Sequence, residues 1–433
     1  MNELNIKSVE ATGNNLRVHF ECKGLVGRFF KDDVFFAKYD TSIEGVPESI
    51  LVIPFLATCL QIVWASKADL YVDAIDEEFL DGLNEIKSSF QKFYPQIGFG
   101  GNIYADKIVK SSVNGYTKSM ILFSGGVDSL ATYIRHRSEN PILASIHGSD
   151  IKVDNYKAWN TVMKSFQSFS EKTESKHMTI QSNFNKINSH VMLNSYYGRY
   201  VTGSWWGGVK HGLALLGLCA PITYTEEINK LYIASSFTKL FSYPWGSHPD
   251  IDNNVKWAGT KAEHDGYELS RQDKIEVIAD YIRKEYPDLY IRSCWASDKG
   301  LNCSKCEKCS RTITGLELAG SDPNNHGYIV NADTFKVIKK KLLSGWPIGE
   351  DEEYMWQDLQ SHCDLDKDFP HLEAKKLATW LLDINIEELK HKSSKKTSLH
   401  KFEQICMFYL KYFPDPLPKI IEYLYLSLRV HFR

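Results

Sequence analysis

The sequence predicts an α/β fold with a doubly wound parallel sheet for the middle of this chain, and three observations lead to that prediction. Apolar runs of strand length alternate with helix-length amphipathic stretches between residues 119 and 293. The runs at 120–123 and 141–146 are apolar almost throughout, which is typical of strands buried on both faces. A glycine turn separates the first run from a helical pattern.

Each predicted element of this region has its own local pattern. The strand at 120–123 ends at a glycine pair, and the apolar residues beyond the turn have helical spacing. The helix at 270–285 begins at Ser270, and Asp273 three residues later makes an imperfect capping box. The other elements follow from apolar periodicity: strands at 141–146, 177–181, 230–235 and 289–293, and helices at 156–169 and 204–220. The carboxyl ends of parallel strands meet at one edge of the sheet. We therefore expect one pocket there, lined by the loops after Phe123, Ile146, Ser235 and Ser293.

The chain is long enough for two or three domains, because it has 433 residues. Residues 1–115 predict an α+β accessory domain, with strands at 7–19 and 28–39 and helices at 50–65 and 76–94. Residues 116–328 hold the α/β domain. Residues 329–433 predict a helical accessory domain, with helices at 332–343, 372–382, 399–413 and 419–430.

Charge and composition exclude several classes of partner. The net charge is −3 and the pI is near 6.5, so no overall basic field attracts nucleic acid, and we do not expect a nucleic-acid partner. The first residues lack a basic segment followed by an apolar core. The most apolar stretch, 50–65, is short and is interrupted by Pro54 and Gln61. We therefore expect no secretory signal, no membrane partner and a cytoplasmic location.

The loop at residues 124–129, Ser-Gly-Gly-Val-Asp-Ser, is the first motif that indicates chemistry. It joins a buried strand to a helix, so its backbone N–H groups gather at a helix N-terminus, where an anion is favoured. Its glycines let the backbone approach phosphate oxygens closely. The candidate nucleotide-binding residues are Phe123, Ser124, Gly125, Gly126, Val127, Asp128, Ser129, Leu130 and, after the next strand, His147.

Two features limit what the 124–129 loop can be. It is not a Walker A loop, because no G-x4-G-K-[ST] pattern occurs in the chain. Asp128 cannot hold a phosphate by charge, so it is a candidate to bind Mg²⁺ or to cap the helix. The competing interpretation is a plain strand-to-helix turn.

The second motif is the cysteine cluster, defined as Cys294, Cys303, Cys306 and Cys309. Three cysteines in seven residues, with a fourth just upstream, can reach one tetrahedral centre. Four thiolates predict a closed structural Zn²⁺ site that ties the end of a strand to the start of a helix. The alternatives are an iron–sulfur cluster, which uses similar ligands, and free thiols.

Five other residues are weaker candidates. Lys210 lies among glycines at a helix start and could pair with a phosphate, although a solvated helix face is an equally good interpretation. His147 follows a strand end. Trp245, His248 and Asp250 lie in a loop that could face a substrate, with Trp245 offering an aromatic face for stacking and Asp250 a carboxylate that accepts N–H groups.

The order of these two motifs resembles that of the PP-loop ATP pyrophosphatases, and in particular that of the 7-cyano-7-deazaguanine synthases. The 124–129 loop is followed by the cysteine cluster, then by a helix and a tail that matches the family pattern AG-x-x-D-P…Y. The resemblance covers residues 118–328, and its tail residues are Ala319, Gly320, Asp322, Pro323 and Tyr328.

This resemblance implies a PP-loop fold, also called HUP-like, that uses ATP with Mg²⁺ and carries Zn²⁺. The family binds 7-carboxy-7-deazaguanine, adenylates its carboxylate and lets ammonia attack, and a second ATP dehydrates the amide to a nitrile. On this basis the expected catalytic residues are Ser124, Asp128 and Lys210.

The chain departs from this family in its two flanking regions, and that outline resembles the longer synthase-like proteins of the bacterial antiphage systems type IV CBASS and Qat. The resemblance implies a ligase that joins the deazaguanine carboxyl to an amine, such as the N-terminus of a partner protein from the same operon. Three alternatives stay open: a small-molecule synthase that uses ammonia, a PP-loop enzyme that modifies tRNA or a base, and a non-catalytic nucleotide-binding scaffold.

Overall fold

The computed structural model describes residues 1–111, 115–294, 297, 299–393, 408–414, 417 and 421. Its strands are β1 Glu3–Thr12, β2 Asn15–Lys23, β3 Val34–Tyr39, β4 Asp69–Asp76, β5 Ile103–Val109, β6 Lys118–Leu122, β7 Ile142–His147, β8 His177–Ser182, β9 Ile228–Ala234, β10 Lys256–Trp257 and β11 Thr260–Asp265. Its α-helices up to the cysteine cluster are α1 Glu48–Leu51, α2 Ile53–Ser66, α3 Glu77–Phe93, α4 Val127–His136, α5 Tyr156–Thr173, α6 His190–Tyr197, α7 His211–Leu218, α8 Ala220–Thr225, α9 Pro249–Asp252 and α10 Arg271–Lys284. Beyond it follow α11 Glu307–Leu318, α12 Ala332–Ser344, α13 Glu350–Ser361, α14 Leu372–Asp383 and α15 Ile386–Ser393, and the short turns include η1 Gly24–Phe29, the π-helical turn η3 Trp206–Lys210 and η6 Leu410–Tyr412.

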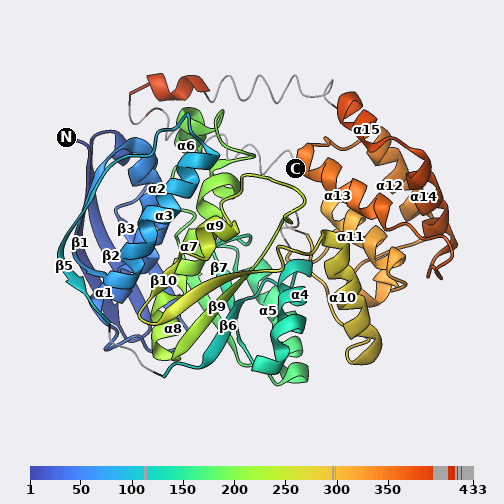
Figure 1. The fold of residues 1–433 in the computed structure, drawn as a ribbon, viewed down its shortest axis with the longest axis horizontal. Helices are drawn as coiled ribbons and strands as arrows, with labels where there is room; N and C mark the ends of the chain where they lie inside the picture. Colours follow the sequence, from blue (N-terminus) through green and yellow to red (C-terminus); the bar gives the residue numbers. More distant parts are fainter. Residues whose placement is uncertain are drawn as a thin grey trace.

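The strands of the described residues join in one sheet, in the order β10-β11-β9-β6-β7-β8-β3-β2-β1-β4-β5 (Figure 1). In its centre β11, β9, β6, β7 and β8 run parallel, with β6 paired to β9 on one side and to β7 on the other. The chain leaves β6 for β7 and later returns to the other side of β6, so the strand order reverses there. The α/β expectation is confirmed as a mostly parallel sheet with helices, and the 124–129 loop follows the strand at the reversal, where ligands bind in such sheets.

Alternating side chains of the central strands pack into two hydrophobic cores. Met120 and Leu231 face one core, which also takes in α2 and α7, while Ile121 and Tyr232 face the other, between the sheet and α4, α5 and α10. This alternation is the period of two that a strand buried on both faces must have. The 124–129 loop thus follows a strand, β6, that is packed on both of its faces.

The N-terminal strands extend the same sheet. β3 pairs antiparallel with β8, and one core runs from Leu4 on β1 to Ala262 on β11. Helices cover one face of this extension, whereas Tyr71 and Tyr104 are stacked and exposed on β4 and β5. Residues 1–111 therefore share a sheet and a core with the α/β region, and the domain boundaries at 115 and 328 stay a prediction.

One predicted strand is wrong, and four strands of the structure, β4, β5, β10 and β11, were not predicted. Residues 289–293 form no strand: the amide of Arg292 donates to the carbonyl of Gly125 (2.8 Å) and that of Ile291 to the carbonyl of His326 (3.2 Å). The strand β11, which pairs with β9, was not predicted because its sequence TKAEHD is too polar to suggest a buried strand. Asp265 and His264 of β11 are buried with internal polar partners: Asp265 contacts His136, and His264 contacts Asp252.

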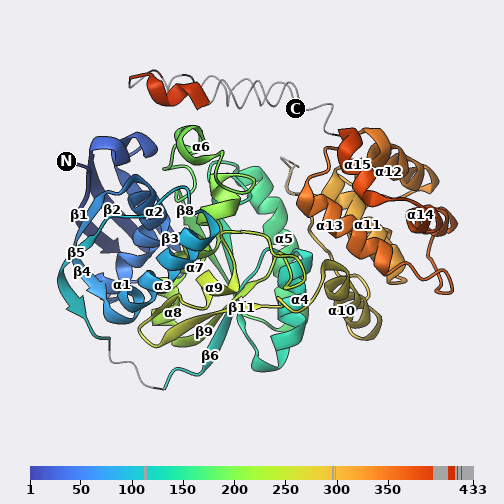
Figure 2. The same cartoon turned by 45° about the horizontal axis from the view of Figure 1, so that its top comes forward.

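The C-terminal region is helical as far as the structure describes it. Helices α12 to α15 pack beside α10 and α11 (Figure 2), and they include the predicted helices at 332–343 and 372–382. Most of the predicted helices at 399–413 and 419–430 lies outside the described residues. Residues 408–413 contact the other end of the molecule, where the guanidinium of Arg28 donates to the carbonyl of Lys411 (2.8 Å).

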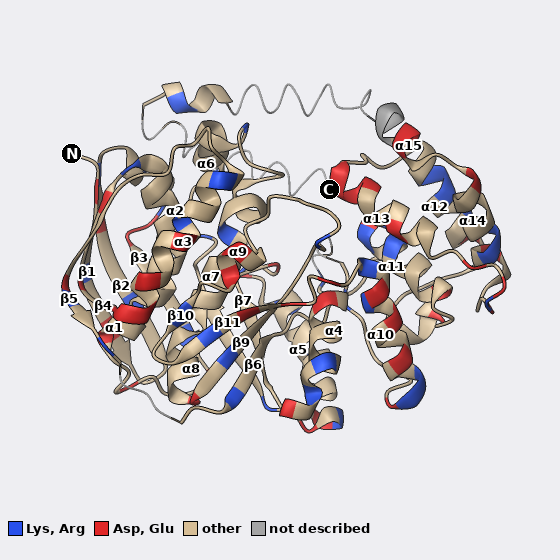
Figure 3. Cartoon of the chain, in the orientation of Figure 1, with Lys and Arg blue, Asp and Glu red and all other residues tan. Residues whose placement is uncertain are grey.

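The described surface carries both signs of charge. Figure 3 shows Lys and Arg interspersed with Asp and Glu along the elements, so no single basic face stands out in that view. None of the described helices combines the length and the apolar character that crossing a membrane requires.

Candidate functional site

The 124–129 loop is organised by its own hydroxyl groups. The backbone N–H of Ser124 donates to Oγ of Ser129 (3.3 Å), and the N–H of Gly126 donates to Oγ of Ser124 (3.4 Å). Oγ of Ser129, which is buried, in turn donates to the carbonyl of Gly126 (3.2 Å). These bonds curl the backbone over the start of α4, where an anion is favoured.

The two glycines are required by close packing around the loop. Gly125 has φ +66°, and a Cβ there would lie 2.6 Å from Cε1 of Phe166 on α5. A Cβ on Gly126 would lie 3.2 Å from the carbonyl oxygen of Arg292. The sequence predicts that these glycines let a phosphate approach. In the structure, the missing side chains also leave room for Phe166 and for the backbone of Arg292.

We expect Gly125→Ala to lower the free energy of unfolding by about 2–3 kcal/mol, because left-handed strain adds to the overlap with Phe166. The control is Gly13→Ala in the β1–β2 turn, which also has positive φ (+58°) but no atom within 4 Å of the new Cβ. It should cost only about 1 kcal/mol. Denaturant unfolding measures both variants, and equal losses would show that Phe166 yields at no cost.

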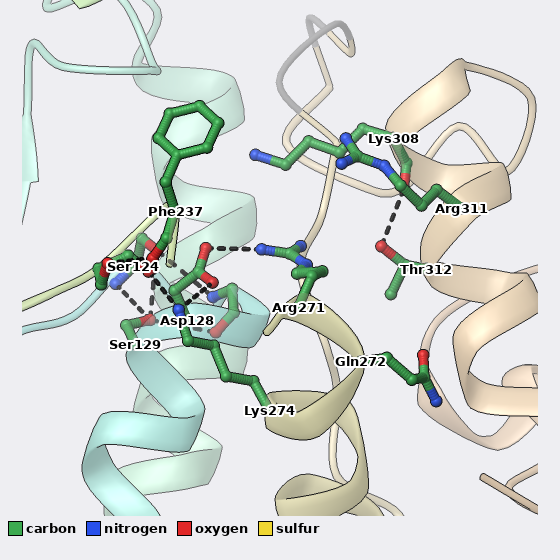
Figure 4. A network of polar contacts seen from close by, with 12 residues as sticks. Ser124, Asp128, Ser129, Phe237, Arg271, Gln272, Lys274, Lys308, Arg311 and Thr312 are labelled. Atoms are coloured by element: carbon green, nitrogen blue, oxygen red, sulfur yellow. Dashed lines mark hydrogen bonds and ion pairs between the residues drawn. The ribbon is translucent and has the colours of Figure 1, made fainter. Parts of the chain in front are cut away.

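Asp128 is held by two cationic side chains of α10. Its carboxylate oxygens lie 2.6 Å from Nη1 of Arg271 and 3.4 Å from Nζ of Lys274 (Figure 4). Both cations are buried, with 7% and 3% of their side chains exposed. Burial alone would raise the pKa of Asp128, but the charges of Arg271 and Lys274 outweigh it and lower that pKa. Asp128 is therefore an anion that holds two cations beside the loop.

Magnesium is a weaker fit to this loop than the sequence suggested. Within the described residues, the one group of three or more His, Cys, Asp or Glu ligand atoms close enough to share a metal is the cysteine cluster. Nucleotide-bound Mg²⁺ takes one or two carboxylates and otherwise phosphate oxygens and waters. The carboxylate of Asp128 is already paired, so the expected Mg²⁺ stays a prediction.

Further cationic side chains gather around the same space. Nη1 of Arg292 lies 3.4 Å from the carbonyl oxygen of Ser124 and 3.7 Å from the carboxylate of Asp150. Lys308 and Arg311 reach toward it from α11 (Figure 4). Sequence reasoning missed Arg271, Lys274 and Arg292, because nothing local distinguishes them from solvated helix and loop residues.

The cysteine cluster has the geometry of a four-thiolate metal site. The four Sγ atoms all lie within 4.8 Å of one another, and the Cys294–Cys306 and Cys303–Cys309 pairs are each 3.9 Å apart. A tetrahedral zinc centre with Zn–S bonds of ~2.3 Å requires S···S distances of about 3.8 Å. The donor set therefore fits zinc, as the spacing predicted.

Backbone amides support this centre. The N–H of Cys306 donates to Sγ of Cys303 (3.2 Å), and the N–H of Cys309 donates to Sγ of Cys306 (3.4 Å). Such donors offset the charge of metal-bound thiolates. Oδ1 of Asn302 accepts from the amides of Ser293 (2.9 Å) and Cys294 (3.2 Å), which ties the two limbs of the loop together. The cluster thereby fixes the segment that contacts the 124–129 loop through Arg292.

Lys210 has the contacts of a structural residue. Its side chain is fully buried in η3, and its ammonium donates to the carbonyl of Phe184 and to Oδ1 of Asn188. Burial lowers the pKa of Lys210 well below its usual value. These bonds organise the loop after β8, and they give no support to the catalytic role expected for Lys210.

His147 and the apolar loop residues also face away from the space above the loop. The ring of His147 stacks on Trp159 at 4.7 Å and lines a cavity of about 470 Å³ beside β8 and α5. The side chains of Phe123, Val127 and Leu130 belong to the core beneath the loop. Only their backbone is available to a nucleotide.

The loop predicted to face the substrate is divided between two places. Trp245 lies 5.4 Å from the ring of Phe237, which stands beside Ser124 and Asp128 (Figure 4). His248 instead caps α9 and contacts Phe93 of α3, and Asp250 is largely exposed there. Of the three, Trp245 is the one that contacts Phe237, which follows β9, the neighbour of β6 in the sheet.

His211 is a candidate that sequence reasoning did not assign. Its ring lies 5.9 Å from that of Trp245, and burial lowers its pKa. Nδ1 of His211 and Nε1 of Trp245 are buried without a hydrogen-bond partner among the described residues. Buried polar atoms are normally paired, so these two nitrogens mark a place where a polar ligand would be stabilised.

One comparison with characterised proteins agrees with this site. The chain is 27% identical over 220 residues to a 7-cyano-7-deazaguanine synthase from Chlorobium phaeovibrioides, a match that covers 47% of this chain and 93% of the relative. No family model matches the chain, and no solved structure matches it. Together with the 124–129 loop and the cysteine cluster, this likeness supports kinship with the 7-cyano-7-deazaguanine synthases for about half of the chain.

Proposed function

We propose that this chain is an ATP-dependent ligase that adenylates the carboxylate of 7-carboxy-7-deazaguanine and transfers the acyl group to an amine. The observation that carries the proposal is the 124–129 loop, with its N–H groups at the start of α4 and with Arg271 and Lys274 held beside it by Asp128. A loop of this kind binds phosphates, and the surrounding cations stabilise charge on a leaving pyrophosphate. The similarity to a 7-cyano-7-deazaguanine synthase supports an ATP-using enzyme.

The proposed reaction has two displacements. A carboxylate oxygen forms a bond to the α-phosphorus of ATP, and the bond from that phosphorus to the bridging oxygen breaks, so pyrophosphate leaves with the electron pair. The amine nitrogen then bonds to the acyl carbon, the bond to AMP breaks, and the amine proton passes to solvent. The loop and its cations act on the first displacement, where negative charge develops on the pyrophosphate.

The corner formed by Trp245 and His211 is the proposed site for the flat ring. Trp245 and Phe237 offer aromatic faces for stacking. The indole N–H of Trp245 donates only, whereas Nδ1 of His211 donates or accepts according to its tautomer. A deazaguanine ring carries both donors and acceptors on its edges, and it would satisfy these two nitrogens.

The proposed acceptor is a protein amine, the N-terminus of a partner in an antiphage system, rather than ammonia. The support is the extent of the chain outside the matched half, which a small-molecule synthase does not require. With ammonia as acceptor, the product would be the free amide or nitrile, and the protein would be a synthase of the ordinary kind.

Pyrophosphate release with and without 7-carboxy-7-deazaguanine tests the activation step. We expect release that depends on the deazaguanine, and its absence would remove the proposed substrate. Mass spectrometry of co-expressed operon partners tests the acceptor: a deazaguanine-sized mass addition supports the ligase. Clean conversion to the free nitrile with ammonia, ATP and Mg²⁺ would contradict protein conjugation.

A further inference from the structure

Lys308 stands between two ligands of the cysteine cluster and is directed into the site. It is the second residue of α11, with Cys306 before it and Cys309 after it. Figure 4 shows its side chain extended from α11 toward the side of the site where Phe237 and Asp128 lie. Arg311 of the same helix forms an ion pair with Glu307 (3.1 Å), so its charge is already balanced by a carboxylate.

The ammonium of Lys308 lacks a counterion of its own. Among the residues that the structure describes, no carboxylate or carbonyl oxygen lies within bonding distance of it, whereas Arg271 and Lys274 share Asp128 and Arg292 is near Asp150. Among the described residues, four cationic side chains thus face two carboxylates in this part of the site: Arg271, Lys274, Arg292 and Lys308 against Asp128 and Asp150. An excess of positive charge in a partly buried site favours a bound anion.

We propose that Lys308 binds the α-phosphoryl group of ATP and so screens the approach of the substrate carboxylate. This inference rests on the proposed function. The N–H groups of the 124–129 loop and the Arg271–Lys274 pair lie at the start of α4, which is the place we assign to the terminal phosphates. Lys308 comes from the opposite helix, so it meets the next phosphoryl group outward. There the carboxylate and the phosphoryl group are both negative, and a cation between them lowers their repulsion.

The cysteine cluster gains a second role from this arrangement. A zinc ion held by Cys306 and Cys309 would fix the first turn of α11, and the backbone of Lys308 with it. Lys308 is therefore a positioning link between the metal centre and the nucleotide.

The test compares Lys308→Met with Lys305→Met in the full-length protein. Lys305 lies in the same loop between Cys303 and Cys306, and its side chain is exposed; its backbone carbonyl accepts a hydrogen bond from Lys341 (2.9 Å). Zinc content is measured first, and both variants should equal the wild type. If Lys308→Met loses zinc, Lys308→Gln takes its place.

Calorimetric titration with α,β-methylene-ATP and with inorganic pyrophosphate then separates the phosphate subsites. Lys308→Met should bind the ATP analogue about 30-fold more weakly, because one charge-assisted bond is lost. Its affinity for pyrophosphate should change less than about 3-fold, and Lys305→Met should change neither. Lys308→Arg should recover most of the analogue affinity because it keeps the charge.

Two results would overturn the assignment. One is that Lys308→Met and Lys305→Met bind the ATP analogue with equal affinity. The other is that Lys308→Met loses the same factor of affinity for the analogue and for pyrophosphate. The proposed function fails separately. A wild type that binds the analogue through Lys308 but releases no pyrophosphate with 7-carboxy-7-deazaguanine would keep this inference and remove the substrate. A wild type that binds neither probe would overturn both.

Discussion

Replacement of Cys309 by serine should abolish zinc binding and lower the free energy of unfolding by at least about 3 kcal/mol. Cys309 is buried, and its Sγ lies 3.9 Å from that of Cys303, so serine removes one of four ligands from an enclosed centre. The loss should spread to the 124–129 loop, because Arg292 and α11 both depend on the cluster for their positions. Metal analysis and denaturant unfolding measure the two effects.

Cys363→Ser is the matched control for this replacement. Cys363 also forms no disulfide, but it follows α13, packs against the second core, and its Sγ hydrogen-bonds to the carbonyl of Leu359 (3.4 Å) rather than to another cysteine among the described residues. It should retain zinc and lose less than about 1 kcal/mol. A Cys309→Ser protein that keeps about one zinc per chain would contradict the four-thiolate centre. A metal other than zinc, with the same dependence on Cys309, would keep the cluster and change the ion.

Asp128→Asn should lower the free energy of unfolding by roughly 3 kcal/mol at neutral pH, because it leaves Arg271 and Lys274 buried without their counterion. It should also slow deazaguanine-dependent pyrophosphate release by about 100-fold or more, since both cations would lose their fixed positions beside the loop. Denaturant unfolding and a pyrophosphate assay measure the two effects.

The stabilising effect of Asp128 has a defined pH dependence. Its pKa in the folded chain is lowered relative to the unfolded value of about 3.9. The unfolded chain therefore binds the proton more readily, and the contribution of Asp128 is complete above pH ~4 and is lost as pH falls through the folded pKa. The difference between wild type and Asp128→Asn should be constant from pH 6 to 8, at roughly 3 kcal/mol, and should shrink in acid.

Asp280→Asn on the exposed side of α10 provides the comparison. Asp280 also pairs with an arginine, Arg283, but both side chains are about half exposed. Its removal should cost less than about 0.5 kcal/mol. If Asp128→Asn were as mild as Asp280→Asn while activity still fell, Asp128 would act on the nucleotide or its metal rather than through Arg271 and Lys274.

The local motifs and the element types could be predicted because short-range chemistry determines them. The 124–129 loop lies between a strand and a helix. The apolar run before it predicts the strand, and the helical spacing of apolar residues after it predicts the helix. The cysteine cluster depends mainly on spacing, since Cys303, Cys306 and Cys309 lie within seven residues. The capping box at Ser270 and Asp273 likewise formed as expected.

Long-range contacts account for the expectations that failed. Residues 289–293 have the apolar pattern of a strand, but their amides bond to Gly125 of the 124–129 loop and to His326 instead of to a neighbouring strand. The polar strand β11 is buried because its charged residues find internal partners, which no local pattern reports. The position of Lys210 among glycines suggested a phosphate ligand. In the fold its ammonium is buried and donates to the carbonyl of Phe184 and to Oδ1 of Asn188.

The sequence by itself therefore determined the phosphate-type loop, the four-thiolate site and the alternation of strands and helices, because each depends on neighbours in the chain. Only the tertiary structure decided which charges meet the loop. Arg271 and Lys274 lie more than 140 residues after Asp128, and Lys308 is farther still. Burial strengthens the electrostatic attraction between these cations and a bound anion, because water is excluded and few counterions compete.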